Sequence, residues 1–125
     1  MLGTRDAVAN VAVKDLETAK KFYEDTLGLK PVHIEGDEVI VFQSGNSTMN
    51  VYRSAYAGTN QATAVTWAVG DDIENVVGEL KGKGVRFEHY DMPGMRLEGD
   101  IHVADGMKVA WFKDPDGNIL NVISG

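Results

Sequence analysis

The sequence lacks several features, and each absence narrows the class of protein. None of its 125 residues is cysteine, which excludes disulfide bonds, thiolate metal sites and a cysteine nucleophile. No apolar run approaches the ~20 residues that cross a bilayer. The N-terminal MLGTRDAVAN segment does not show the basic and apolar regions of a secretion signal. We therefore expect a cytoplasmic protein.

Positive charge is also scarce. The 12 Lys and Arg residues are outnumbered by 19 Asp and Glu residues, which gives a net charge of −7. This excess argues against nucleic acid and membranes as partners, since phosphate groups and anionic lipids would be repelled. Hydrophobic residues make up 43% of the chain and charged residues 25%, a composition typical of a globular protein. The length is that of one ordinary domain.

Two stretches of the chain look alike. Each begins as a strand pattern and continues as a helix pattern, at 7–13 and 15–28 and again at 63–69 and 71–84. Asp15 and Asp71 are suited to cap the helix starts, and Glu74 would complete a capping box with Asp71. Gly28 and Gly84 are suited to end the helices. The same spacing separates the two caps and the two glycines, which indicates an internal duplication.

Short strand patterns follow each helix. They lie at 31–35, 38–43 and 48–53 in the first half and at 85–90, 108–113 and 118–123 in the second. Pro115 and Gly117 in DPDGN predict a tight hairpin turn before the last strand. A small, polar linker at 54–62 separates module one, 1–56, from module two, 62–125, within one domain spanning 1–125. The second module also has a long loop at 91–106, with room for a further short strand.

Two segments carry a resemblance to a known family: VAVKDLETAKKFYEDTLGLKPV at 11–32 and VAWFKDPDGNILNVIS at 109–124. They resemble the vicinal oxygen chelate superfamily, which includes glyoxalase I, bleomycin-resistance proteins and extradiol dioxygenases. The resemblance implies an α+β fold. Two tandem βαβββ modules form a curved mixed sheet, an incomplete barrel around a cup, with the helices outside. It also implies a homodimer. In the family's enzymes one divalent metal ion sits in the cup, held by the first and fourth strands of each module.

The resemblance assigns the four metal-ligand positions to Val8, Asn50, Ala64 and Asn121. Val and Ala have no donor atom, and a neutral amide is a weak ligand for metals that prefer imidazole or carboxylate. We therefore predict no metal ion and no cofactor. The expected function is metal-independent binding of an apolar or aromatic small molecule, as in the bleomycin-resistance branch, for sequestration, transport or storage. In that branch the site often forms between two chains.

Strand alternation selects most of the side chains that would face such a ligand, and the 91–106 loop adds Arg96. The predicted ligand-binding residues are Val8, Asn10, Asn50, Tyr52, Ala64, Thr66, Arg96, Trp111 and Asn121. Alternatively, the two metal-position Asn residues bond neighbouring groups and are structural. Trp67 is expected in the core, whereas Trp111 and Phe42 suit either a ligand-binding wall or the core.

The 91–106 loop allows two interpretations. Its Met92, Met95 and Leu97 side chains would close over a ligand as a lid while Arg96 contacts an anionic group, or the loop packs at a dimer interface.

Two other functions stay open, and no catalytic residue is assigned. The first is an enzyme of the same fold, a lyase, isomerase or dioxygenase. It would use a relocated metal ion at His33, Glu35 or His102, or acid–base chemistry without metal. The candidate acid–base residues are Glu35, Glu88, Glu98 and His102. The second is an interaction domain whose cup is filled by its own side chains.

Overall fold

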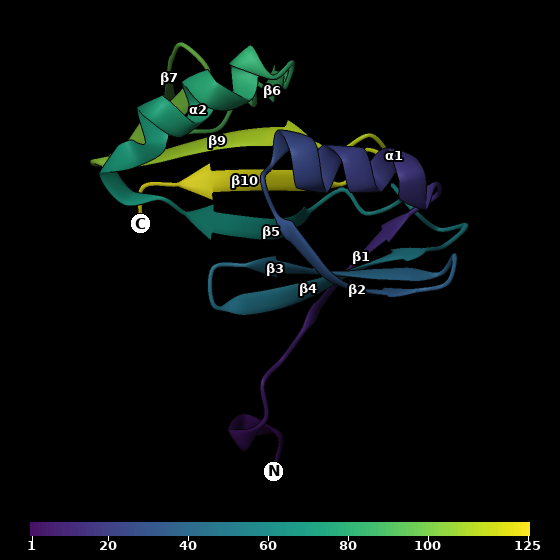
Figure 1. Cartoon of the computed structure of the whole chain (residues 1–125). Helices are drawn as coiled ribbons and strands as arrows, with labels where there is room; N and C mark the ends of the chain where they lie inside the picture. Colours follow the sequence, from purple (N-terminus) through teal and green to yellow (C-terminus); the bar gives the residue numbers. More distant parts are fainter. The chain divides into compact units, whose positions relative to one another are not determined.

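A computed structural model describes residues 1–125. The chain divides into two compact units, residues 1–59 and 60–125, and the division falls inside the expected linker. Each unit is α+β, with a mixed sheet and a helix of its own (Figure 1). None of the helices combines the length and the apolar character needed to span a bilayer.

Unit one has the βαβββ order expected from the sequence. Its elements are η1 (Leu2–Thr4), β1 (Ala9–Val13), α1 (Leu16–Lys20), η2 (Lys21–Thr26), β2 (Lys30–Glu35), β3 (Val39–Ser44) and β4 (Ser47–Arg53). The strand order across the sheet is β1-β4-β3-β2. β1 runs parallel to β4, and the other pairs are antiparallel. The helix connection between β1 and β2 allows this parallel pairing, because parallel strands need a crossover.

Asp15 caps the first helix, as predicted. Its carboxylate accepts hydrogen bonds from the backbone N–H of Glu17 at 3.0 Å and the hydroxyl of Thr18 at 2.9 Å. The expected single helix is interrupted, because α1 passes into a π-helical turn, η2, in which the Leu27 N–H reaches back to the Phe22 carbonyl. Apolar periodicity does not distinguish the two helix types over so short a segment.

The core of unit one lies on one face of its sheet. Strand alternation buries Met49 and Val51 of β4 and leaves Asn50 and Tyr52 half-buried on the other face. Phe42 is fully buried, with its ring centroid 5.9 Å from that of Tyr23. Of the two roles open to Phe42, the structure therefore gives it the core.

Unit two extends the same plan by two strands. Its elements are β5 (Thr63–Ala68), η3 (Gly70–Asp72), α2 (Ile73–Gly82), β6 (Phe87–Glu88), β7 (Arg96–Glu98), β8 (Ile101–Ala104), β9 (Met107–Lys113) and β10 (Ile119–Ile123). The strand order is β5-β10-β9-β8-β7, with β6 also paired to β9. Most of the 91–106 segment, expected as a loop, is thus a β7–β8 hairpin. The strand expected at 85–90 is reduced to the two residues of β6.

The ends of the second helix differ in how well they were predicted. Gly84 has a φ of +93° and ends the helix as expected. The predicted capping box of Asp71 and Glu74 is wrong, since a 3-10 turn precedes α2 and Asp72 occupies the N-cap without a side-chain hydrogen bond. The Asp–x–x–Glu spacing alone did not reveal that the turn shifts the helix start by one residue.

The DPDGN hairpin turn forms as predicted. The buried carboxylate of Asp114 accepts hydrogen bonds from the backbone N–H groups of Asp116 and Asn118, both at 2.9 Å, and from the Asn118 side chain at 2.8 Å. Gly117 has a φ of +90°, which an L side chain rarely adopts. The turn therefore fixes the register with which β10 pairs with β9.

Candidate functional site

Asn121 lies on β10 in the sheet of unit two, with strands on both sides. It stands opposite Trp111 on β9 and beside Thr66 on β5. Cross-strand partners point to the same face of a sheet. The His102 ring lies near, its centroid 4.9 Å from that of Trp111. We call the surface formed by Thr66, His102, Trp111 and Asn121 the Trp111 face.

Asn121 is buried, and its side-chain oxygen Oδ1 has no hydrogen-bond partner in the chain. Almost all buried polar groups in native proteins are paired, so this oxygen is a candidate for a hydrogen bond with water or a ligand. Trp111 is half-buried and donates its Nε1–H to Thr63 at 3.1 Å. Thr66 is exposed. The Asn121 amide oxygen thus lies between an aromatic side chain and a small, open position.

His102 is also buried, 1% exposed. Its Nε2 accepts a hydrogen bond from the backbone N–H of Tyr90 at 2.9 Å. A nitrogen that accepts a hydrogen bond has a free lone pair, so the ring proton of this imidazole is on Nδ1. Nδ1 has no acceptor in the chain, and the Tyr90 hydroxyl also lacks a partner. Two buried donors on one side of Trp111 therefore lack an acceptor, and the Asn121 Oδ1 on the other side lacks a donor.

The equivalent face of unit one is arranged differently. Asn50 stands opposite Asn10, and its Nδ2 donates to the Asn10 Oδ1 at 3.2 Å. Tyr52 lies two residues further along β4 on the same face and is half-buried. Asn50 is thus hydrogen-bonded to a neighbouring strand, which agrees with the structural interpretation of the two Asn residues. The Asn121 oxygen has no such bond. The two positions look alike in sequence and differ in their hydrogen bonding.

The remaining predicted positions are open. Val8 lies one residue before β1 and is 42% exposed. Ala64 is exposed and lies where the register between β5 and β10 is irregular. Arg96 is exposed on β7, and its guanidinium pairs with Glu98 at 2.8 Å.

The donor set does not fit the divalent metal ion that the resemblance implies. Val8 and Ala64 have no donor atom, and the Asn50 and Asn121 amides bring no negative charge to balance a cation. Nowhere in the chain do three or more His, Asp or Glu side chains gather closely enough to hold a metal ion.

His33 and Glu35, considered for a relocated site, bond each other at 2.7 Å and are exposed. The alternative acid–base candidates differ in burial. Glu35 and Glu98 are exposed, the first hydrogen-bonded to His33 and the second ion-paired with Arg96. Glu88 is half-buried, 3.6 Å from the Lys113 ammonium. Of the four candidates, only His102 is buried.

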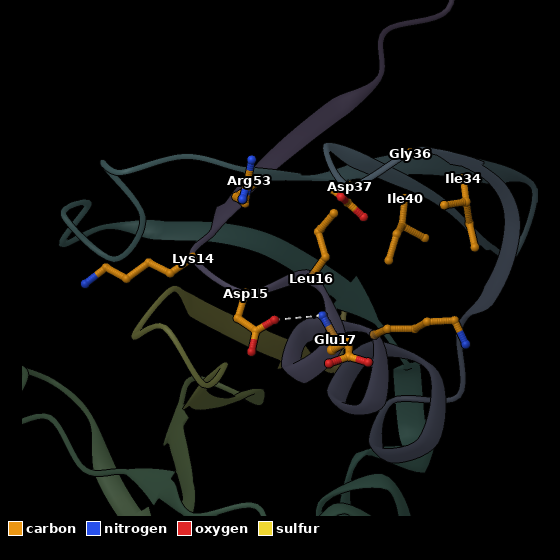
Figure 2. A pocket seen from close by; sticks show the side chains of 10 residues that line it. Lys14, Asp15, Leu16, Glu17, Ile34, Gly36, Asp37, Ile40 and Arg53 are labelled. Carbon is orange, nitrogen blue, oxygen red and sulfur yellow. Dashed lines mark hydrogen bonds between the residues drawn. The ribbon is translucent and has the colours of Figure 1, made fainter.

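Sequence reasoning missed a cavity of about 420 Å³ in unit one, shown in Figure 2. Leu16 of α1 and Ile34 and Ile40 of the sheet form its apolar part. Arg53 at its edge pairs with Glu38 at 2.7 Å. Periodicity placed Ile34 on a strand but could not show that its side chain is 51% exposed at this cavity.

A second cavity, of about 330 Å³, lies in unit two. His102, Tyr90 and the β7 residues Arg96 and Leu97 are among its walls. Nearby, Asp100 accepts hydrogen bonds from Lys81 at 2.6 Å and His89 at 2.7 Å. Both contacts lower the pKa of the Asp100 carboxyl below its ordinary value, and the contact with Lys81 has the larger effect. Neither the partial burial of Asp100 nor the hydrogen bonding of His102 could be predicted from the sequence.

Comparison with known proteins gives a family match over most of the chain. The family model described as Glyoxalase/Bleomycin resistance protein/Dioxygenase superfamily matches residues 6–122. No curated protein sequence matches.

Solved structures share the fold at low sequence identity. A glyoxalase family protein from Enterococcus faecalis has a TM-score of 0.73 and 18% identity, covering 98% of this chain and 99% of its own. Lactoylglutathione lyase from Agrobacterium tumefaciens has a TM-score of 0.68 and 18% identity, covering 94% and 92%. The fosfomycin resistance protein FosX from Listeria monocytogenes has a TM-score of 0.70 and 14% identity, covering 98% and 91%.

Proposed function

We propose, from the premise that the chain belongs to the Glyoxalase/Bleomycin resistance protein/Dioxygenase superfamily, that it binds a small aromatic molecule without a metal ion. The observation that carries this proposal is Asn121. At a position where the resemblance expects a metal-binding carboxylate, the chain has a neutral amide whose buried oxygen lacks a partner. An acceptor oxygen of this kind binds a hydrogen-bond donor, not a metal ion that needs anionic ligands.

The Trp111 face defines the chemistry of the ligand. The Asn121 Oδ1 requires a hydroxyl or N–H group, and the half-buried Trp111 offers an aromatic surface beside it. Thr66 is exposed and leaves the neighbouring position open. A flat aromatic molecule with one hydroxyl or amino group fits these features. Sequestration, transport or storage of such a molecule is the corresponding role.

The test uses p-cresol, which has both an aromatic ring and a hydroxyl donor, and toluene, which lacks the hydroxyl. In a Trp67→Phe background, Trp111 is the remaining tryptophan and its fluorescence reports binding. We expect p-cresol to bind about 5- to 10-fold more tightly than toluene, from one hydrogen bond of about 1 kcal/mol. Asn121→Leu should remove this preference and leave toluene binding unchanged.

A metal chelator is the control, and it should leave all four affinities unchanged. Equal affinity for the two compounds in the parent protein, or a preference that survives Asn121→Leu, would show that Asn121 does not bind the ligand.

An enzyme without a metal ion is the second candidate function, and His102 favours it. A buried imidazole with its proton on Nδ1 is a suitable general acid if a substrate reaches it. Turnover of a carbonyl substrate that is lost in His102→Gln and retained in Asn121→Leu would place this function first.

A further inference from the structure

The cavity of unit two lies beside the β7–β8 hairpin. Tyr90, Met95, Leu97 and His102 are among its lining residues, whereas Trp111 and Asn121 are not. Its volume of about 330 Å³ is within the range of small-molecule pockets, about 300–1,000 Å³. The cavity therefore adjoins the Trp111 face at His102. It does not contain Trp111 or Asn121, on which the proposed function depends.

His102 gives this cavity a defined hydrogen-bonding requirement. The Tyr90 backbone N–H occupies Nε2 and so fixes the tautomer with a proton on Nδ1. This Nδ1–H has no acceptor, and the hydroxyl of Tyr90, another wall residue, is a second buried donor without one. An unpaired buried donor is costly. What the cavity lacks is an acceptor oxygen.

The charges around the cavity favour an uncharged ligand. Arg96 pairs with Glu98 at 2.8 Å, and His89 is bonded to Asp100 at 2.7 Å. Asp91 adds a negative charge to the lining. No cation among the lining residues is left to compensate an anion, and burying an uncompensated anion is unfavourable. The apolar walls formed by Met95 and Leu97 suit a hydrocarbon or aromatic group.

We propose that this cavity binds an uncharged carbonyl compound, a ketone or amide with an apolar or aromatic body, whose carbonyl oxygen accepts a hydrogen bond from His102 Nδ1–H. The Nδ1 atom itself is shielded from solvent, so the ligand reaches it when a wall residue moves. Met95 is the side chain suited to this movement, because it has three rotatable bonds.

The experiment titrates three probes into the full chain with ¹⁵N-labelled histidine: benzamide, benzoate and toluene. Benzamide supplies a neutral carbonyl oxygen, benzoate an anionic oxygen and toluene none. We expect benzamide to bind at least about 5-fold more tightly than either, the difference that one buried hydrogen bond makes. We also expect benzamide to shift the His102 Nδ1–H proton resonance downfield.

Two variants locate the binding. Leu97→Trp fills the cavity from a side chain that is 45% exposed, and it should abolish the benzamide effect without disturbing the fold. Asn121→Leu removes the group on which the proposed function depends, and it should leave benzamide binding intact. The binding of p-cresol therefore tests the proposed function, and the binding of benzamide tests this second proposal.

Four results would overturn the proposal. Toluene binding as tightly as benzamide would remove the carbonyl requirement, and tighter binding of benzoate would identify an anion site. Benzamide binding that survives Leu97→Trp would place the probe elsewhere. No shift of the His102 resonance with any probe would show that the cavity holds water only.

Discussion

Replacing Asn121 by Leu should stabilise the protein while removing its preference for a donor-bearing ligand. Asn121 is 7% exposed, and its Oδ1 has no partner in the chain. Leu has the same number of side-chain heavy atoms, branched at the same carbon, and no polar atom, so the substitution removes the unsatisfied oxygen without creating a cavity. The matched control is Asn50→Leu, because Asn50 occupies the equivalent strand position but donates a hydrogen bond to Asn10 at 3.2 Å.

The expected magnitude follows from two opposing effects. An unsatisfied buried polar group costs about 1–3 kcal/mol. The change of shape from a planar amide to a branched side chain costs less than about 1.5 kcal/mol in packing, which offsets part of this gain. The net gain in the free energy of unfolding is therefore about 1 kcal/mol, which for a chain of this length raises Tm by about 4 °C. For Asn50→Leu we expect a loss of about 0.5 kcal/mol, because a half-exposed hydrogen bond is removed.

Urea denaturation at pH 7, followed by circular dichroism, measures both free energies of unfolding. A destabilisation of Asn121→Leu by more than about 1 kcal/mol would refute the reasoning, since the oxygen would then have a partner in the folded protein. Equal effects of the two substitutions would show that the hydrogen-bonding difference between the units does not exist in solution.

Three further predictions concern the turn and the ion pairs of unit two. Asp114→Ala should lower the free energy of unfolding by about 3 kcal/mol, because three hydrogen bonds to a buried carboxylate are lost. Urea denaturation measures this loss, with Asp6→Ala as the control. A loss below about 1 kcal/mol would contradict the turn geometry. Gly117→Ala should cost about 1 kcal/mol, because φ is +90°; an unchanged Tm would show that the turn relaxes. The third concerns Asp100, whose pKa is lowered from 3.8 by Lys81 and His89. Its ion pairs contribute stability above the unfolded pKa, and this is lost as pH falls through the lower folded pKa. Stability measured from about pH 5 to about pH 2 should therefore fall less in Asp100→Asn than in the parent, and parallel curves would mean that the pairs do not persist in solution.

The elements of unit one could be predicted because local signals agreed there. Asp15 caps its helix by accepting hydrogen bonds from Glu17 and Thr18. Strand alternation correctly separates buried Met49 and Val51 from Asn50. The β7–β8 hairpin was not predicted as two strands. Its strands are only three and four residues long, and β8 is held in the sheet by pairing with β9, which lies later in the chain.

The candidate site was only partly accessible from the sequence. Repetition located Asn121 and strand alternation placed it with Trp111, but the missing partner of its oxygen is a property of packing. No sequence motif marks His102, because its tautomer is set by a hydrogen bond from the Tyr90 N–H, twelve residues away. Ala64 shows a similar limit, because regular alternation assumes a regular register and the structure has an irregularity there.

The most direct test of metal independence is the metal content of protein purified without chelators. Elemental analysis should be combined with thermal shifts on addition of nickel, zinc, manganese and iron(II). We predict no metal in stoichiometric amount and no rise in Tm with any ion, because Val8, Ala64, Asn50 and Asn121 supply neither the donors nor the charge that these ions require. One tightly held ion per chain, with a matching rise in Tm, would contradict the account and favour an enzyme whose metal ligands lie elsewhere in the chain.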